Sequence, residues 1–117
     1  MSALDISRWA DEVGADLGEA ALAIKTELFS GVVLNTRVKE GRLRGNWQVS
    51  QNAPIYSEID RFDKEGSVVI DDIENTVTVD GVEFLTNNLP YAEVWNERDG
   101  IIDGEFARLD QIIKGAI

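Results

Sequence analysis

Two glutamates offer the simplest catalytic geometry in this chain. Glu93 and Glu97 are four residues apart in a segment that predicts a helix, so their carboxylates share one face. A general acid and a general base can be arranged in this way. Exposed like charges on a helix have the same spacing far more often, and no nucleophile or base motif stands nearby. We therefore interpret the pair as a solvated helix face.

A second acidic group could be read as a divalent-metal site. It consists of Asp71, Asp72, Glu74 and Asp80. Oxygen ligands suit such ions, but the spacing matches no calcium-loop pattern. Asp80 also precedes Gly81, a pair that is typical of a tight turn. We expect a solvated surface here, with no metal.

The composition lowers the expectation of catalysis further. The chain has no His and no Cys, which removes the commonest general base, the commonest metal ligand and any thiol nucleophile. The glycine-flanked segment GRLRG lacks the Lys-Ser/Thr of a phosphate-binding loop. We expect no cofactor and a protein that is not an enzyme, and a carboxylate enzyme is the least favoured alternative.

The length and hydropathy indicate a single folded domain. The chain has 117 residues, which suffices for one core over positions 1–117. Its longest apolar run is too short for a membrane span, and its start has no signal-peptide pattern. We expect synthesis in the cytoplasm and no membrane association.

The basic residues are unevenly distributed. Four of the eleven lie between Arg37 and Arg44, together with one glutamate, so this segment carries +3. The net charge is −11, and the rest of the chain therefore carries −14. Phosphate backbones are bound by clustered Lys and Arg, so this balance disfavours nucleic-acid binding. A short basic segment on an acidic body favours docking against an acidic protein surface.

A long amphipathic helix is predicted from Asp5 to Asn35, with Ser2 or Asp5 as its cap. Apolar residues recur there at spacings of three and four, which defines one stripe. The stripe comprises Ile6, Trp9, Val13, Leu17, Ala20 or Ala21, Ile24, Leu28 and Val32. We expect it to pack with Trp47 across a sheet.

Alternating residues predict a strand from Leu43 to Ser50. Its inward residues would be Leu43, Gly45, Trp47 and Val49, and its outward residues Arg44, Asn46, Gln48 and Ser50. Residues 53–66 have no sustained period and predict a connection that is mobile or partner-dependent in the free protein. β-Branched residues around the Asp-Gly pair at 80–81 predict a hairpin of 76–79 with 82–86.

The C-terminal part predicts helices. Pro90 is suited to open a short helix with Asn88 as its cap, and Tyr91 and Trp95 share a face of it. Breaks are expected at Gly100 and Gly104. A terminal helix over 105–117 would bury Phe106, Leu109, Ile112 and Ile113. The fold class is thus α+β: a long N-terminal helix on a small antiparallel sheet, with short C-terminal helices.

Two segments resemble the signature of the tail-completion, or neck, proteins of tailed bacteriophages, a family that includes the Z-type minor tail proteins. NTRVKEGRLRGNWQVS resembles the block T-P-V-D-T-G-R-x-R-x-x-W, with matches at Thr36, Val38, Gly41, Arg42, Arg44, Asn46 and Trp47. Arg37, Lys39 and Glu40 depart from it. FLTNNLPYAEVWNERDG resembles the block L-x-N-x-x-P-Y-A-x-x-x-E-x-G, with matches at Leu85, Asn87, Pro90, Tyr91, Ala92 and Glu97. The resemblance fades after Gly100, where the family has a closing strand.

This resemblance implies a structural virion protein of the neck, at the head–tail junction. Such proteins form a homo-oligomeric ring, expected here to be a hexamer, through which double-stranded DNA passes without specific binding. The neighbours would be head-connector or portal-side proteins and tail-terminator or tail-tube proteins. A ring subunit needs two different complementary patches, which a bipolar chain can supply, and an acidic lumen would repel DNA phosphates.

The basic segment is the predicted subunit interface. The candidate residues are Arg37, Lys39, Arg42, Arg44, Tyr91, Glu93 and Glu97. The arginines would meet Glu93 and Glu97 of the next copy, because the planar guanidinium suits carboxylates. In the alternative, the arginines pair within their own subunit. The alternative function is an acidic protein-binding module, such as a DNA mimic that occupies a DNA-binding protein.

Overall fold

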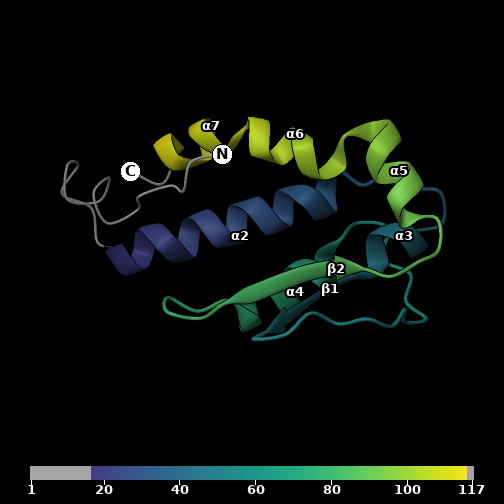
Figure 1. The fold of residues 1–117 in the computed structure, drawn as a ribbon, viewed down its shortest axis with the longest axis horizontal. Helices are drawn as coiled ribbons and strands as arrows, with labels where there is room; N and C mark the ends of the chain where they lie inside the picture. Colours follow the sequence, from purple (N-terminus) through teal and green to yellow (C-terminus); the bar gives the residue numbers. More distant parts are fainter. Residues whose placement is uncertain (1–16, 116–117) are drawn as a thin grey trace.

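The computed structural model describes residues 17–115, which fold into helices and a two-stranded sheet (Figure 1). The elements are α2 (Leu17–Asn35), α3 (Arg42–Gly45), β1 (Trp47–Gln51), α4 (Ser67–Thr76), β2 (Glu83–Asn87), α5 (Ala92–Asp99), α6 (Ile101–Ala107) and α7 (Leu109–Gly115). The predicted α+β class is confirmed: a long helix, an antiparallel sheet and short C-terminal helices. The first part of the predicted long helix, with its candidate caps Ser2 and Asp5, lies outside the described residues.

Helix α2 runs through the middle of the molecule, with α6 and α7 on one side and the sheet with α4 on the other (Figure 1). Strands β1 and β2 are antiparallel, with Trp47 opposite Asn87 and Gln51 opposite Glu83. Helix α4 packs against both β1 and α2. The central core comprises Val32, Val33, Trp47, Val69, Ile73, Val77 and Ile101. One core therefore joins α2, the sheet, α4 and α6.

The apolar stripe on α2 packs largely as predicted. Ala20, Ile24 and Val32 are buried, and Leu28 is half-buried. Trp47 is buried too, with 5% of its surface exposed, and it belongs to the same core as Val32. Ala21, the alternative to Ala20, is half-buried, and the members of the stripe before residue 18 lie outside the residues whose side chains are described.

The predicted hairpin is wrong, because residues 77–79 form no strand and the partner of β2 is β1. Residues 67–76, which precede it, form helix α4. Val69, Ile73 and Val77 are four residues apart and buried, which is the spacing of a helix face. The buried carboxylate of Asp63 accepts a hydrogen bond of 3.0 Å from the backbone N–H of Val69, in the first turn of α4. Burial of one helix face thus overrides the strand preference of β-branched residues.

The loop before β2 is held by a buried ion pair with α2. Lys25 Nζ lies 2.8 Å from Glu83 Oε1, and the Glu83 side chain is 1% exposed. The same Nζ donates hydrogen bonds of 2.8 Å to the carbonyl oxygens of Thr78 and Gly81. Burial alone would raise the pKa of Glu83, but hydrogen bonding and charge from Lys25, with help from Thr78, lower it overall. The loop around Asp80 and Gly81 is therefore held by a contact with a distant residue, Lys25, and not by a tight turn between two strands.

The predicted strand from Leu43 is half wrong. Residues 42–45 form the helical turn α3, and the strand begins at Trp47. Asn46 and Gln48, predicted to face outward, are 0% and 8% exposed. The Asn46 side chain bonds to Arg42 O and to the Ile59 N–H, and Gln48 Nε2 donates to Ser57 O at 2.6 Å. The chain after β1 therefore covers this face of the strand. The alternating pattern in the sequence marks apolar and polar residues, but residues of both kinds are buried.

Residues 52–66 contain no helix or strand, as predicted, yet they are tied to the domain at several points. Arg61 donates to the carbonyl oxygens of Gly45 and Trp47, at 2.6 and 2.8 Å, and pairs with Asp72 on α4 at 3.0 Å. The carbonyl of Ile55 accepts bonds from side chains at the end of β2. The mobility of this segment in the free protein stays a prediction, and these contacts are what would have to open.

The C-terminal helices differ from prediction in their boundaries. Helix α5 begins at Ala92, so Pro90 lies in the preceding turn, and the Asn88 side chain donates to Ile55 O instead of capping the helix. Gly100 has φ 61° and ends α5, whereas Gly104 lies inside α6. The expected single terminal helix is therefore two helices, which meet at Arg108.

The burial of the C-terminal helices is also only partly as predicted. Leu109 and Ile113 are buried, but Phe106 is 47% exposed; the side chain of Ile112 lies outside the described set. Glu105, and not Phe106, is fully buried, and it lies against Gly31 of α2. A side chain at position 31 would clash with the Glu105 carboxylate. Its oxygens accept bonds from Asn35 and Arg108, so the buried charge is paired. Among residues 17–115, none of the helices has the length and apolar character needed to traverse a bilayer.

Candidate functional site

The basic segment and helix α5 enclose a groove of about 540 Å³. Its lining comprises Arg37, Val38, Lys39, Glu40, Gly41, Arg42, Leu43, Tyr91 and Trp95. Four of the seven predicted interface residues thus meet in one place: Arg37, Lys39, Arg42 and Tyr91. We call this feature the groove. Its walls are basic on the side of residues 37–42 and aromatic on the side of α5.

Arg37 is bound within its own subunit. Its Nε and Nη2 donate to the two carboxylate oxygens of Asp99, at 2.6 and 2.7 Å. Its guanidinium carbon also lies 3.9 Å from the centre of the Trp95 ring. The hydrogen bond from Arg37 lowers the pKa of Asp99 and raises that of Arg37 itself. This arginine therefore fixes the aromatic wall of the groove instead of reaching outward.

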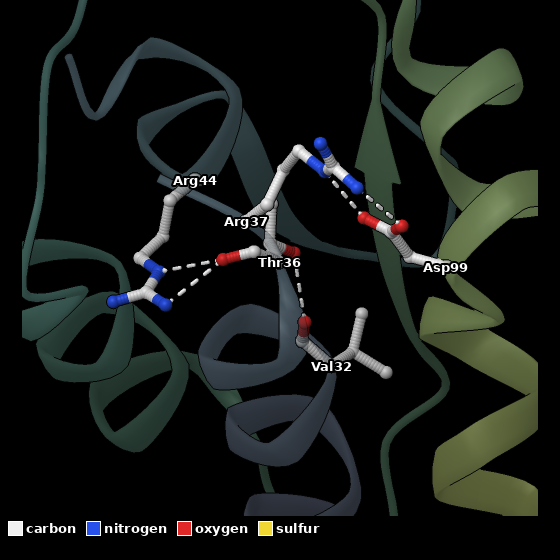
Figure 2. A network of polar contacts seen from close by, with 5 residues as sticks. All are labelled: Val32, Thr36, Arg37, Arg44 and Asp99. Atoms are coloured by element: carbon white, nitrogen blue, oxygen red, sulfur yellow. Dashed lines mark hydrogen bonds and ion pairs between the residues drawn. The ribbon is translucent and has the colours of Figure 1, made fainter. Parts of the chain in front are cut away.

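Arg44 is bound even more completely. Its guanidinium donates to the carbonyl oxygens of Thr36, Leu34 and Lys64, with shortest distances of 2.8, 3.0 and 2.7 Å. Two of these carbonyls belong to the end of α2 and the residue after it, where no helical N–H is left to pair with them. In Figure 2 Arg44 and Arg37 lie on opposite sides of Thr36. Arg44 thus caps α2 within its own subunit, and its contact with another copy stays a prediction.

Thr36 links this cap to the core. Its hydroxyl donates to Val32 O at 2.9 Å (Figure 2) and accepts a bond of 2.7 Å from Trp47 Nε1. Thr36 is 1% exposed, so the Thr36 hydroxyl and the Trp47 indole N–H are both hydrogen-bonded without contact with water. We call Thr36, Arg44 and Trp47 the junction, because they join the end of α2 to α3 and β1.

Asn87 joins the two parts of the sequence that resemble neck proteins, and Gly41 holds the first part against residues 63–64. Gly41 has φ 91°, and a Cβ there would lie 2.6 Å from the backbone nitrogen of Lys64. Asn87 Nδ2, at the end of β2, donates to Leu43 O at 2.8 Å. Leu43 in turn packs with Leu89 and Ala92. Asn87 and Ala92, two matched residues of the second segment, therefore contact Leu43 in the first.

Arg42 and Lys39 are the cations that remain available in the groove. Within residues 17–115 the Arg42 side chain has only a long contact with Glu58, 3.7 Å between Nη2 and Oε1, and both side chains are more than a third exposed. Its Nε is buried and has no hydrogen-bond partner among the described residues. Lys39 is exposed, and within residues 17–115 its ammonium makes no ion pair.

Tyr91 and the two glutamates lie on different faces of α5. Tyr91 is 39% exposed and precedes the helix, on the same face as Trp95. Glu93 and Glu97 each follow one of these aromatic residues by two positions, which is roughly 200° around a helix. Both glutamates are exposed and unpaired within the described part of the chain. The helix therefore presents an aromatic face to the groove and an acidic face away from it.

Sequence reasoning missed Trp95 and Asp99 as parts of this site. The signal was present, because Tyr91, Trp95 and Asp99 recur every four residues and so lie on one helix face. That pattern could show a shared face but could not show that Arg37 would be opposite it.

The described residues hold no group of three or more His, Cys, Asp or Glu side chains that could bind a metal ion. Asp71, Asp72 and Glu74 lie exposed on α4, and Asp72 pairs with Arg61.

The cations of the groove can hold anionic side chains, and its aromatic wall can pack against apolar ones. Comparison with known proteins gives no match to this chain, whether with protein-family models, curated proteins or solved structures.

Proposed function

We propose that this protein is a structural component of a tailed-phage particle that forms a homo-oligomeric ring at the neck, between head and tail. The observation that carries the proposal is the meeting of the two neck-like segments. They are separated by more than thirty residues, yet β1 of the first pairs with β2 of the second, and Arg37 bonds to Asp99. A signature spread over two distant segments is expected to describe one three-dimensional unit.

The distribution of charge supports the same proposal. The groove concentrates cations on a chain whose net charge is −11, and the acidic face of α5 points away from it. A ring is built by heterologous contacts, in which one patch meets a different patch on the next copy. Surplus carboxylates elsewhere would keep passing DNA from adhering.

The proposal is tested by removing the reading frame from the genome that encodes the chain. We expect filled heads and separate tails in electron micrographs, and joined particles when the protein is supplied in trans. Mass spectrometry of purified wild-type particles should detect the chain. Normal particles after the deletion, or particles without the chain, would contradict a neck role. A monomer that copurifies with a DNA-binding protein and not with particles would favour the DNA mimic.

A further inference from the structure

We propose that the groove receives the acidic face of α5 from a second copy of this chain, so that Lys39 and Arg42 of one copy meet Glu93 and Glu97 of the next. This inference rests on the proposed ring and names the contact that would build it. It assigns the interface to two of the four cations in the basic segment, because Arg37 and Arg44 are already bound inside their own subunit.

The exposed guanidinium of Arg42 is the first argument. The Arg42 side chain is 41% exposed, so part of its guanidinium is open to an incoming acceptor. The only ion pair of Arg42 within residues 17–115 is the 3.7 Å contact with Glu58, too long to be a good hydrogen bond. A carboxylate in the groove would satisfy the guanidinium and also pair with Lys39.

The second argument is that the two surfaces are complementary in more than charge. The groove has two exposed apolar side chains beside its cations, Val38 and Tyr91, each 39% exposed. The acidic face of α5 has Val94 at its edge, 53% exposed between the two glutamates in sequence. An acidic helix with one apolar residue therefore fits a basic groove with apolar walls.

The third argument is directional. The groove uses one face of α5, and the glutamates lie on the opposite face of the same helix. A copy whose groove is filled still presents its own glutamates to another copy. Such a contact repeats from one copy to the next, as a closed ring requires, instead of ending at a symmetric pair.

The absence of cysteine from the chain allows a clean cross-linking test on the full protein. Val38→Cys and Val94→Cys variants are mixed and treated with a short bismaleimide. We expect a cross-linked heterodimer that is much more abundant than in a matched mixture of Val38→Cys with Val68→Cys. Val68 is an equally exposed valine on α4, away from both surfaces. Equal yields from the two mixtures would overturn the proposal.

Charge reversal provides the second arm. Lys39→Glu with Arg42→Glu in the Val38→Cys chain should reduce the yield roughly tenfold. Glu93→Lys with Glu97→Lys in the Val94→Cys chain should then restore much of it. The matched control, Asp71→Lys with Glu74→Lys in the Val94→Cys chain, should not. An unchanged yield after the first reversal, or rescue by the control, would overturn the proposal.

A phosphate backbone is the competing anion. If the groove reversal abolishes binding of a fluorescent DNA duplex and leaves the cross-link unchanged, the groove binds nucleic acid and the proposal is overturned.

The result of the cross-linking test can be separated from the test of the proposed neck function. A specific cross-link in a protein that is absent from particles keeps the contact and removes the neck role, whereas a neck defect without a cross-link does the reverse.

Discussion

The junction and the groove are built from the same short stretch of chain, yet they have opposite tasks. In the junction, the side chains of Arg44 and Trp47 donate hydrogen bonds within their own subunit, and Thr36 accepts from both. In the groove, Arg42 has only the 3.7 Å contact with Glu58, and Lys39 makes no ion pair within residues 17–115. The difference shows that a cluster of cations need not act as one unit. Backbone carbonyls at the end of a helix accept hydrogen bonds from Arg44, whereas Arg42, two residues earlier, has only a long contact with Glu58 within residues 17–115.

Replacing the two tryptophans should give the largest contrast. Trp47→Ala removes a buried side chain from the core and leaves the Thr36 hydroxyl without its donor, so we expect a loss of about 3–5 kcal/mol in the free energy of unfolding. Trp95→Ala, at the half-buried wall of the groove, should cost clearly less. Chemical denaturation measures both. A Trp47→Ala loss below about 1 kcal/mol would break the distinction.

Replacing Arg44 and Arg42 should give a smaller contrast, in which one substitution mainly lowers stability and the other mainly weakens self-association. Arg44→Ala should reduce the free energy of unfolding by about 1–3 kcal/mol, because three carbonyl groups lose a charged donor. Arg42→Ala should change it by less than about 0.5 kcal/mol. The order should reverse when self-association is measured on the folded variants. Equal stability losses would mean that both arginines are structural.

The pH dependence of stability should give the smallest contrast, between the buried pair Lys25–Glu83 and the more exposed pair Arg37–Asp99. Both carboxyl groups have a pKa below the ordinary value in the folded protein. Their contributions are therefore complete above the unfolded values, about pH 4, and are lost as the pH falls through the lower folded values.

Denaturation at several pH values should thus show a loss of stability below about pH 4 that Glu83→Gln and Asp99→Asn each reduce. Added salt should weaken the effect of Asp99→Asn more than that of Glu83→Gln, because the Glu83 side chain is 1% exposed and that of Asp99 is 22% exposed. Equal salt sensitivity would place both pairs in the same environment.

The sequence by itself determined the features that depend on local periodicity. The α+β class, the helical stripe at Ala20, Ile24 and Val32, and the shared face of Tyr91 and Trp95 all follow from spacing, because one face of each element must be buried. It also located the basic segment that lines the groove. The functional reading, a neck ring, stays a proposal that rests on two short resemblances.

Tertiary structure decided what depends on contacts between distant residues. Residues 67–76 form a helix whose Val69 and Ile73 are buried between α2 and β1. Their spacing of four residues fits a helix face, but their β-branched side chains favour a strand, and the tertiary contacts decide between the two. The sequence does not show which of Arg37, Arg42 and Arg44 is bound within the subunit. Only the fold brings Asp99 to Arg37 and the helix-end carbonyls to Arg44, because these groups are distant from each other or differently oriented along the chain.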